Sequence, residues 1–177
     1  MDIDDAVIGA TAGMAATGPM TLVMEAIHRA LPQHERDVLP PRRIVENLLE
    51  STGQRHEFAE RHEFALTLLS HFAYGGAVAS VYPTIKKQLD ARAAIPEPLG
   101  GIAFGLAVWA ASYAGVLPAL GLYPPPQRET ARRNALMIGA HVIWGASMGL
   151  LAGALKKTSG SRPRIGSRRG GGSLARR

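Results

Sequence analysis

The feature that most constrains this chain is the gathering of its apolar residues into four stretches, with most charges lying between them. The stretches cover about residues 6–31, 64–85, 99–122 and 135–155. Each is about 20 residues or more, the length that a helix needs to cross roughly 30 Å of hydrocarbon. The mean hydropathy of the whole chain, +0.02, would suit a soluble protein, but that average hides the clustering. The sequence therefore predicts an integral membrane protein.

The expected fold is an all-α, integral membrane four-helix bundle. A span surrounded by lipid must satisfy its own backbone hydrogen bonds, which a helix does, and the alternating segments of a barrel are absent. Within the first long connection, Ile44, Val45, Leu48 and Leu49 recur at helical spacing beside charged residues. This pattern predicts an amphipathic helix over about residues 41–51, lying on the membrane surface.

We divide the chain into a transmembrane domain, residues 1–157, and a basic tail, residues 158–177, which we expect to be disordered. From residue 156 to the end there are eight Lys or Arg and no acid. Such charge suits anionic lipids, whereas nucleic acid is not an expected partner because no aromatic residue is interleaved. The predicted lipid-binding residues are Lys156, Lys157, Arg168 and Arg169. Four spans place both termini on one side of the membrane, and the distribution of basic residues favours the cytoplasm.

The second and fourth stretches share a short motif, His-x-x-aromatic-Gly. It reads HFAYG at residues 71–75 and HVIWG at residues 141–145. A proline-rich basic turn precedes each copy, at residues 39–42 and 123–128, and a glycine-rich stretch precedes each turn. This order predicts two copies of a unit built as helix, loop and helix. Because each unit holds two spans, the copies would be parallel, related by an axis along the membrane normal.

Rows of small residues at four-residue steps are expected to carry the packing between helices. Small residues four apart let two helix backbones approach closely within a membrane. The predicted packing residues are Gly9, Gly13, Gly75, Ala79, Gly145, Gly149 and Gly153. The row that begins at Gly145 also offers a contact for a homo-oligomer.

Ionisable residues in the apolar stretches are expected to form one polar cluster, made of Glu25, His28, His71 and His141. The first stretch runs opposite to the second and the fourth, so these residues fall in the same half of the membrane. A carboxylate at membrane depth costs about 2.5–3.5 kcal/mol on insertion scales, and it therefore usually has a partner or a task.

Several readings of this cluster remain open. The groups can be structural, forming hydrogen bonds between helices. They can also form a proton-responsive site, because histidine titrates near neutral pH. Zinc is commonly bound by histidine and carboxylate ligands, which His71, His141 and Glu25 could supply. Two histidines at similar depth on parallel helices could also be the axial ligands of a haem. No ligand pair at helical spacing supports a metal, so we predict neither a metal nor a cofactor.

Motifs of known enzymes are missing from the chain. It has no cysteine, and its glycines lie inside apolar stretches rather than in a phosphate-binding loop after a strand. We therefore expect a non-enzymatic membrane protein that responds to protons through the cluster. The second hypothesis is a small oligomeric transporter or channel component, and the third is a membrane protein that binds a metal or a haem.

Four short segments together resemble the YagU-like inner-membrane proteins of bacteria. They are ATGPM at residues 16–20, LPPR at residues 39–42, HFAYG at residues 71–75 and HVIWG at residues 141–145. The resemblance covers nearly the whole chain except the tail. It implies a multi-pass protein of the bacterial inner membrane with no established biochemical role, and it transfers no catalytic residue.

Overall fold

The computed structural model describes residues 2–33, 36, 38–53 and 62–160. Within those ranges all regular structure is helical, which confirms the all-α class. Four helical stretches are long and apolar enough to cross a membrane. They are Ile3–Ala30, Phe64–Asp90, Glu97–Ala119 and Ala131–Ser159.

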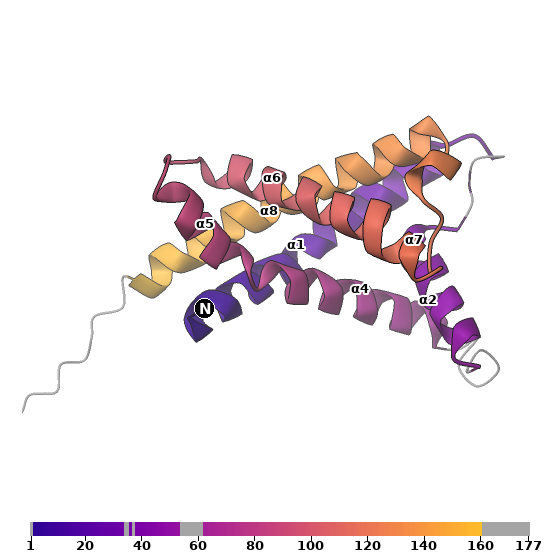
Figure 1. The fold of residues 1–177 in the computed structure, drawn as a ribbon, viewed down its shortest axis with the longest axis horizontal. Helices are drawn as coiled ribbons and strands as arrows, with labels where there is room; N and C mark the ends of the chain where they lie inside the picture. Colours follow the sequence, from indigo (N-terminus) through magenta and orange to yellow (C-terminus); the bar gives the residue numbers. More distant parts are fainter. Residues whose placement is uncertain (1, 34–35, 37, 54–61, 161–177) are drawn as a thin grey trace, which may run out of the picture.

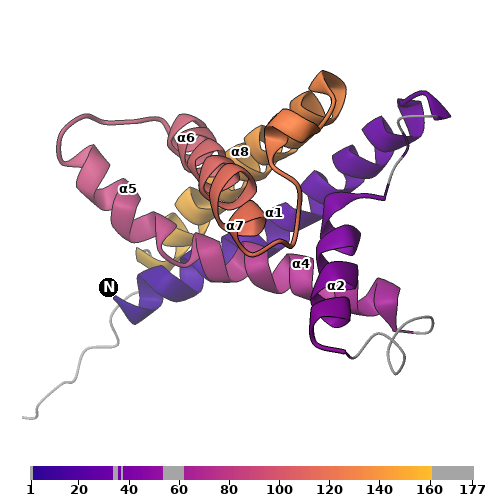
Figure 2. The same ribbon diagram turned by 45° about the vertical axis from the view of Figure 1, so that its right-hand side comes forward.

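The long helices pack in the order α4, α1, α8, α6. Helix α1 (Ile3–Ala30) lies against α4 (Glu63–Ala79) on one side and against α8 (Ala131–Gly160) on the other, and α6 (Glu97–Trp109) packs on α8. Figures 1 and 2 show α1 and α8 in the middle, with α4 and α6 on opposite sides. The start of α1 and the end of α8 lie at the same end of the molecule (Figure 1).

The second apolar stretch is divided into two helices rather than forming one. Helix α4 ends at Ala79, and α5 (Tyr82–Asp90) begins after two intervening residues. Pro83 lies in the first turn of α5, where its missing N–H costs nothing, but inside a longer helix it would leave the Ala79 carbonyl without a donor. The chain therefore bends between α4 and α5, as Figure 2 shows.

The third stretch changes its helical geometry near its end. After α6 comes a π-helical segment, Ala110–Val116, followed by one short turn, α7 (Leu117–Ala119). Pro118 explains the change, because a proline ring clashes with the carbonyl four residues earlier and donates no hydrogen bond. Segments with π geometry are rare and frequently lie at functional sites. Here the segment carries Ser112 and Tyr113.

The short helix predicted at residues 41–51 is present as α2 (Pro40–Ser51). It packs on α4, and its buried residues are Pro40, Val45 and Leu49. The Asn47 side chain donates to the Leu122 carbonyl at 2.8 Å, which joins α2 to the end of the third stretch. The apolar side of α2 therefore meets protein.

Glycines allow α1 to approach α4 closely. A Cβ added at Gly13 would overlap the Gly75 carbonyl and the Ala79 methyl, and one at Gly9 would overlap the Ala79 carbonyl. The Trp144 indole donates to the Gly13 carbonyl at 3.1 Å, so α8 meets α1 at the same level.

A second glycine contact joins α6 to α8. A Cβ at Gly101 or at Gly145 would overlap the carbonyl oxygen of the other residue, and one at Gly105 would overlap the His141 carbonyl. A Cβ at Gly149 would overlap the Glu97 backbone carbonyl, and one at Gly153 would lie 2.9 Å from carbons of the Glu97 side chain. All seven small residues predicted for helix packing are buried, and the row from Gly145 is occupied by α6 within this chain.

The last apolar stretch is longer than predicted, because α8 continues to Gly160. Residues 158–160 of the expected tail are therefore helical, and residues 161–177, with Arg168 and Arg169, lie outside the described residues. At its start, α8 carries a buried ion pair between Arg133 Nε and the Glu129 carboxylate at 2.8 Å. The Arg133 guanidinium also donates to the Tyr123 hydroxyl at 3.1 Å, which fixes the loop that precedes α8.

Candidate functional site

A cavity of about 360 Å³ lies where the helices separate, and we call it the main cavity. Its walls come from α1, α2, α4, α8 and the end of the third stretch (α6, the π-helical segment and α7), and they are almost entirely apolar. Representative apolar lining residues are Met20, Met24, Ile44, Val108, Leu117 and Met137. Volumes of about 300–1,000 Å³ are usual for small-molecule sites, which are mostly apolar with a few orienting polar groups.

His141 is the most deeply buried histidine of the main cavity. Its exposed fraction is 8 %, and its Nδ1 lies 2.8 Å from the Met137 carbonyl oxygen. Since a carbonyl only accepts, Nδ1 must carry the proton, so Nε2 of a neutral ring is a free acceptor. Among the described residues, none bonds to that Nε2, and it is available to a molecule in the cavity.

His71 reaches the main cavity from α4. Its Nδ1 lies 3.4 Å from the Thr21 hydroxyl oxygen, and that hydroxyl donates its own proton to the Thr17 carbonyl at 2.7 Å. The Thr21 oxygen therefore accepts from His71, and the second nitrogen of this ring is again left for another partner. The two histidines of the repeated motif thus line one cavity.

A second cavity, of about 600 Å³, adjoins the first and is more polar. Met24, Pro41 and His71 line both, so His71 lies at their boundary. Other lining residues come from the end of α1, the following loop, α2 and the start of α4, and they include Glu25, His28, Arg36, Arg42, Phe64 and Thr67.

Two buried atoms of the second cavity lack a hydrogen-bond partner among the described residues. They are Nδ1 of His28 and the hydroxyl oxygen of Thr67. A buried polar group without a partner costs about 1–3 kcal/mol, so such groups in native proteins commonly bind water or a ligand. The second cavity is therefore a place where a polar group from outside the chain would be stabilised.

The predicted cluster is divided between the two cavities. His71 and His141 line the main cavity, whereas Glu25, His28 and His71 line the second. The Glu25 carboxylate pairs with Arg29 at 2.9 Å, one turn along α1, and both side chains are exposed. In the described part of the chain, no group of three or more His, Asp or Glu residues is arranged to hold a metal ion.

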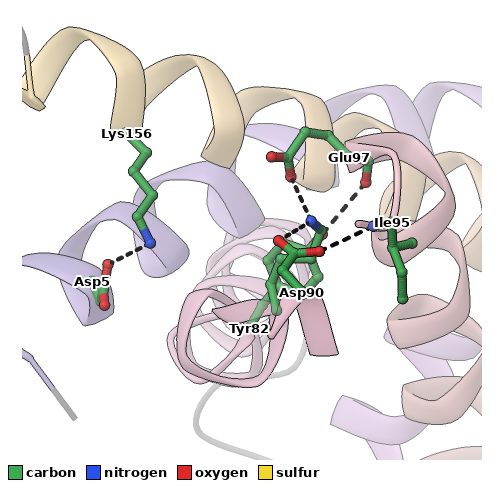
Figure 3. Close-up of polar contacts among 7 residues, drawn as sticks. Asp5, Tyr82, Asp90, Ile95, Glu97 and Lys156 are labelled. Atoms are coloured by element: carbon green, nitrogen blue, oxygen red, sulfur yellow. Dashed lines mark hydrogen bonds and ion pairs between the residues drawn. The ribbon is translucent and has the colours of Figure 1, made fainter. Parts of the chain in front are cut away.

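Sequence reasoning missed an ionic cluster at the opposite end of the molecule, drawn in Figure 3. The buried Lys86 ammonium lies 2.5 Å from the Asp90 carboxylate and 3.8 Å from that of Glu97. The Tyr82 hydroxyl donates to the Glu97 backbone carbonyl at 3.4 Å. The four-residue spacing of Lys86 and Asp90 was a visible signal, but only the fold brings Glu97 to them.

Lys156, one of the predicted lipid-binding residues, pairs with Asp5 of α1 at 3.2 Å (Figure 3). This ion pair joins the start of α1 to the last turns of α8. Lys157 follows on the last turns of α8 and is exposed. The lipid-facing role of these lysines stays a prediction.

No protein-family model, curated protein or solved structure matches this chain. The resemblance to the YagU-like proteins therefore stays a prediction from the four short segments. The assignment of a role depends on the geometry of the two cavities.

Proposed function

We propose that this protein spans the bacterial inner membrane four times and binds an apolar molecule from the bilayer in its main cavity. The observation that carries the proposal is an almost entirely apolar cavity of about 360 Å³ with two imidazoles in its wall. Apolar walls favour a hydrophobic occupant, and the few polar groups orient it. On this view the protein is a non-enzymatic binding protein.

The membrane assignment is supported by the exposure of large apolar side chains along the helices. Leu22, Phe64, Leu69, Leu99 and Leu120 each expose more than half of their surface. In water such surfaces would favour aggregation, whereas hydrocarbon solvates them. Both termini then face the cytoplasm, together with the connection between α5 and α6.

The internal duplication is supported by the two glycine contacts. Gly9 and Gly13 of α1 meet α4 at Gly75 and Ala79, four and eight residues after His71. Gly101 and Gly105 of α6 meet α8 at Gly145 and Gly149, the same distances after His141. We infer that each pair is one copy of a two-helix unit and that the main cavity forms where the copies meet. The four spans then make one bundle.

Fluorescence of Trp144 tests the proposal, because this side chain lines the main cavity and exposes only 3 % of its surface. The chain has two tryptophans, so Trp109→Phe leaves Trp144 as the single tryptophan, which is excited at wavelengths that tyrosine does not absorb. The probe is 9,10-dibromostearyl alcohol, whose bromine atoms quench tryptophan on contact. With protein in detergent micelles, we expect quenching that saturates as the probe fills the cavity.

A matched pair of variants separates binding in the cavity from partition into the micelle. Val108 lines the main cavity, whereas its neighbour Ala107 is exposed on the outside of α6. Val108→Phe fills the cavity and should abolish the saturable quenching, and Ala107→Phe should leave it intact. Quenching of Trp144 that never saturates, or that is equal in both variants, would contradict the proposal.

A proton-responsive role for the same histidines is the second candidate, favoured by the position of His71 at the boundary of the two cavities. The second cavity offers polar groups from which a proton can reach His71, and histidine exchanges protons near neutral pH. Proton flux into liposomes containing wild type or His71→Ala tests it. Equal flux for the two proteins would remove this candidate.

A further inference from the structure

The two adjoining cavities differ in chemistry in the way that the two ends of an amphiphile differ. The main cavity is apolar, and the second holds the unpartnered atoms of His28 and Thr67. Met24, Pro41 and His71 form walls of both. A single molecule crossing that boundary would place a hydrocarbon chain in the first cavity and a polar head in the second.

The partners of the arginines around the second cavity indicate which head group would bind there. Around the second cavity, the carboxylates of Glu25 and Glu46 are each paired within one helix, at 2.9 Å to Arg29 and at 3.0 Å to Arg42. Arg36 also lines the cavity and makes no ion pair with a described residue. Of these three arginines, Arg36 is the one for which the described part of the chain provides no carboxylate partner.

Arg36 is held in place by neutral partners. Its Nε donates to the Leu31 carbonyl at 2.8 Å, and its Nη2 donates to the Arg29 carbonyl at 2.7 Å. These bonds satisfy carbonyls at the end of α1 and fix the guanidinium at the rim, and neither partner is a carboxylate. A guanidinium retains further N–H groups that suit a carboxylate or a phosphate.

The size of the main cavity limits the hydrophobic part. Its volume of about 360 Å³ corresponds to about twelve water-sized groups, at roughly 30 Å³ each. About that number of carbons of one hydrocarbon chain fill such a space, and the remaining carbons of a longer chain would continue into the second cavity. Two chains do not fit.

We propose that the protein binds a single-chain amphiphile with an anionic head group, its chain in the main cavity and its head in the second cavity beside Arg36, His28 and Thr67. This inference rests on the proposed function, since it requires a hydrophobic occupant of the main cavity. It adds the chemical class of that occupant. It also gives the unpartnered His28 and Thr67 atoms a hydrogen-bonding partner.

The test compares two probes that differ only in the head group, 9,10-dibromostearate and 9,10-dibromostearyl alcohol. Both are titrated into the full-length Trp109→Phe protein in detergent micelles while Trp144 fluorescence is recorded. We expect the anionic probe to half-saturate at a concentration about tenfold lower, the factor typical of one hydrogen bond to a charged group.

Variants then locate the head group. Arg36→Gln keeps an amide donor at the position of Nε, for the Leu31 carbonyl, but removes the charge. It should raise the half-saturation of dibromostearate about tenfold while leaving that of the alcohol unchanged. Thr67→Val should weaken binding of both probes, because both heads can bond to the hydroxyl. Arg128→Gln is the control, since Arg128 is exposed and lines neither cavity.

The outcomes separate this inference from the proposed function. Equal half-saturation of the two probes, or an Arg36→Gln effect no larger than that of Arg128→Gln, overturns the anionic head group while leaving the hydrophobic site intact. Saturable binding of the alcohol without binding of the stearate also overturns the anionic head group and leaves the hydrophobic site intact. Absence of saturable quenching by either probe overturns the proposed function and this inference together.

Discussion

Replacing Gly145 by alanine should separate α8 from α6, and its cost can be worked out from the structure. The added Cβ would overlap the Gly101 carbonyl oxygen and lie 2.8 Å from the Gly101 carbonyl carbon and 3.1 Å from the Ile102 Cα. All three are backbone atoms, so no side chain can rotate away to relieve the contact. The two helices would have to move apart along the whole glycine row.

Two opposing terms set the magnitude. Overpacking costs about 1–3 kcal/mol, and rigid backbone neighbours place this site at the upper end. Alanine favours a helix over glycine by about 1 kcal/mol, which offsets part of that cost. The expected result for Gly145→Ala is a loss of about 2 kcal/mol in the free energy of unfolding, or about thirtyfold in the unfolding equilibrium.

Gly139 supplies the control on the same helix, because a Cβ there meets no other side chain or helix within 4 Å. Gly139→Ala should therefore show only the propensity gain, about 1 kcal/mol. Equilibrium unfolding of both variants by sodium dodecyl sulfate in mixed micelles, followed by circular dichroism, measures the difference. If Gly145→Ala is as stable as Gly139→Ala, the close packing of α6 on α8 is refuted.

Two further predictions concern charged pairs. Glu129→Gln removes the Glu129 carboxylate from the buried Arg133 guanidinium and should cost about 3 kcal/mol in unfolding free energy. Glu25→Gln breaks an exposed pair and should cost less than about 1 kcal/mol. Equal losses in the same unfolding assay would contradict this difference. Cysteines at Asp5 and Lys156, introduced into a chain that has none, should be joined within one molecule by a short bismaleimide, since the two native side chains lie 3.2 Å apart. Crosslinks only between molecules would show that the ends of α1 and α8 are not adjacent.

Local sequence signals predicted the helices well where a physical rule acts within one segment. The length and hydropathy of residues 99–122 required a helix, whatever its neighbours. The same reasoning missed the division at Ala79 and the π geometry before Pro118, although both follow from proline chemistry. Pro83 and Pro118 were visible in the sequence as signals of a helix break, but a prediction from hydropathy alone does not take them into account.

The candidate site was predicted only in part, because its residues come together through tertiary contacts. The repeated motif pointed to His71 and His141, and both line the main cavity. Tyr113 and Ser112 of that cavity had no distinguishing pattern, since their position depends on the π-helical segment. Spacing also gave no sign that Arg36 would lie beside the end of α1, because that contact closes a loop whose course the sequence does not specify.

What the sequence by itself determined is the number and hydropathy of the apolar stretches and their helical conformation, since those properties depend on the solvent that each segment requires. The small-residue rows further determined which helix faces could approach closely. Only the tertiary structure decided which rows pair, that of α1 with α4 and that of α6 with α8. The physical reason is that a glycine ridge is complementary to any other ridge of similar spacing. The choice among ridges, and the cavity left between the two pairs, depends on how all the helices fill space together.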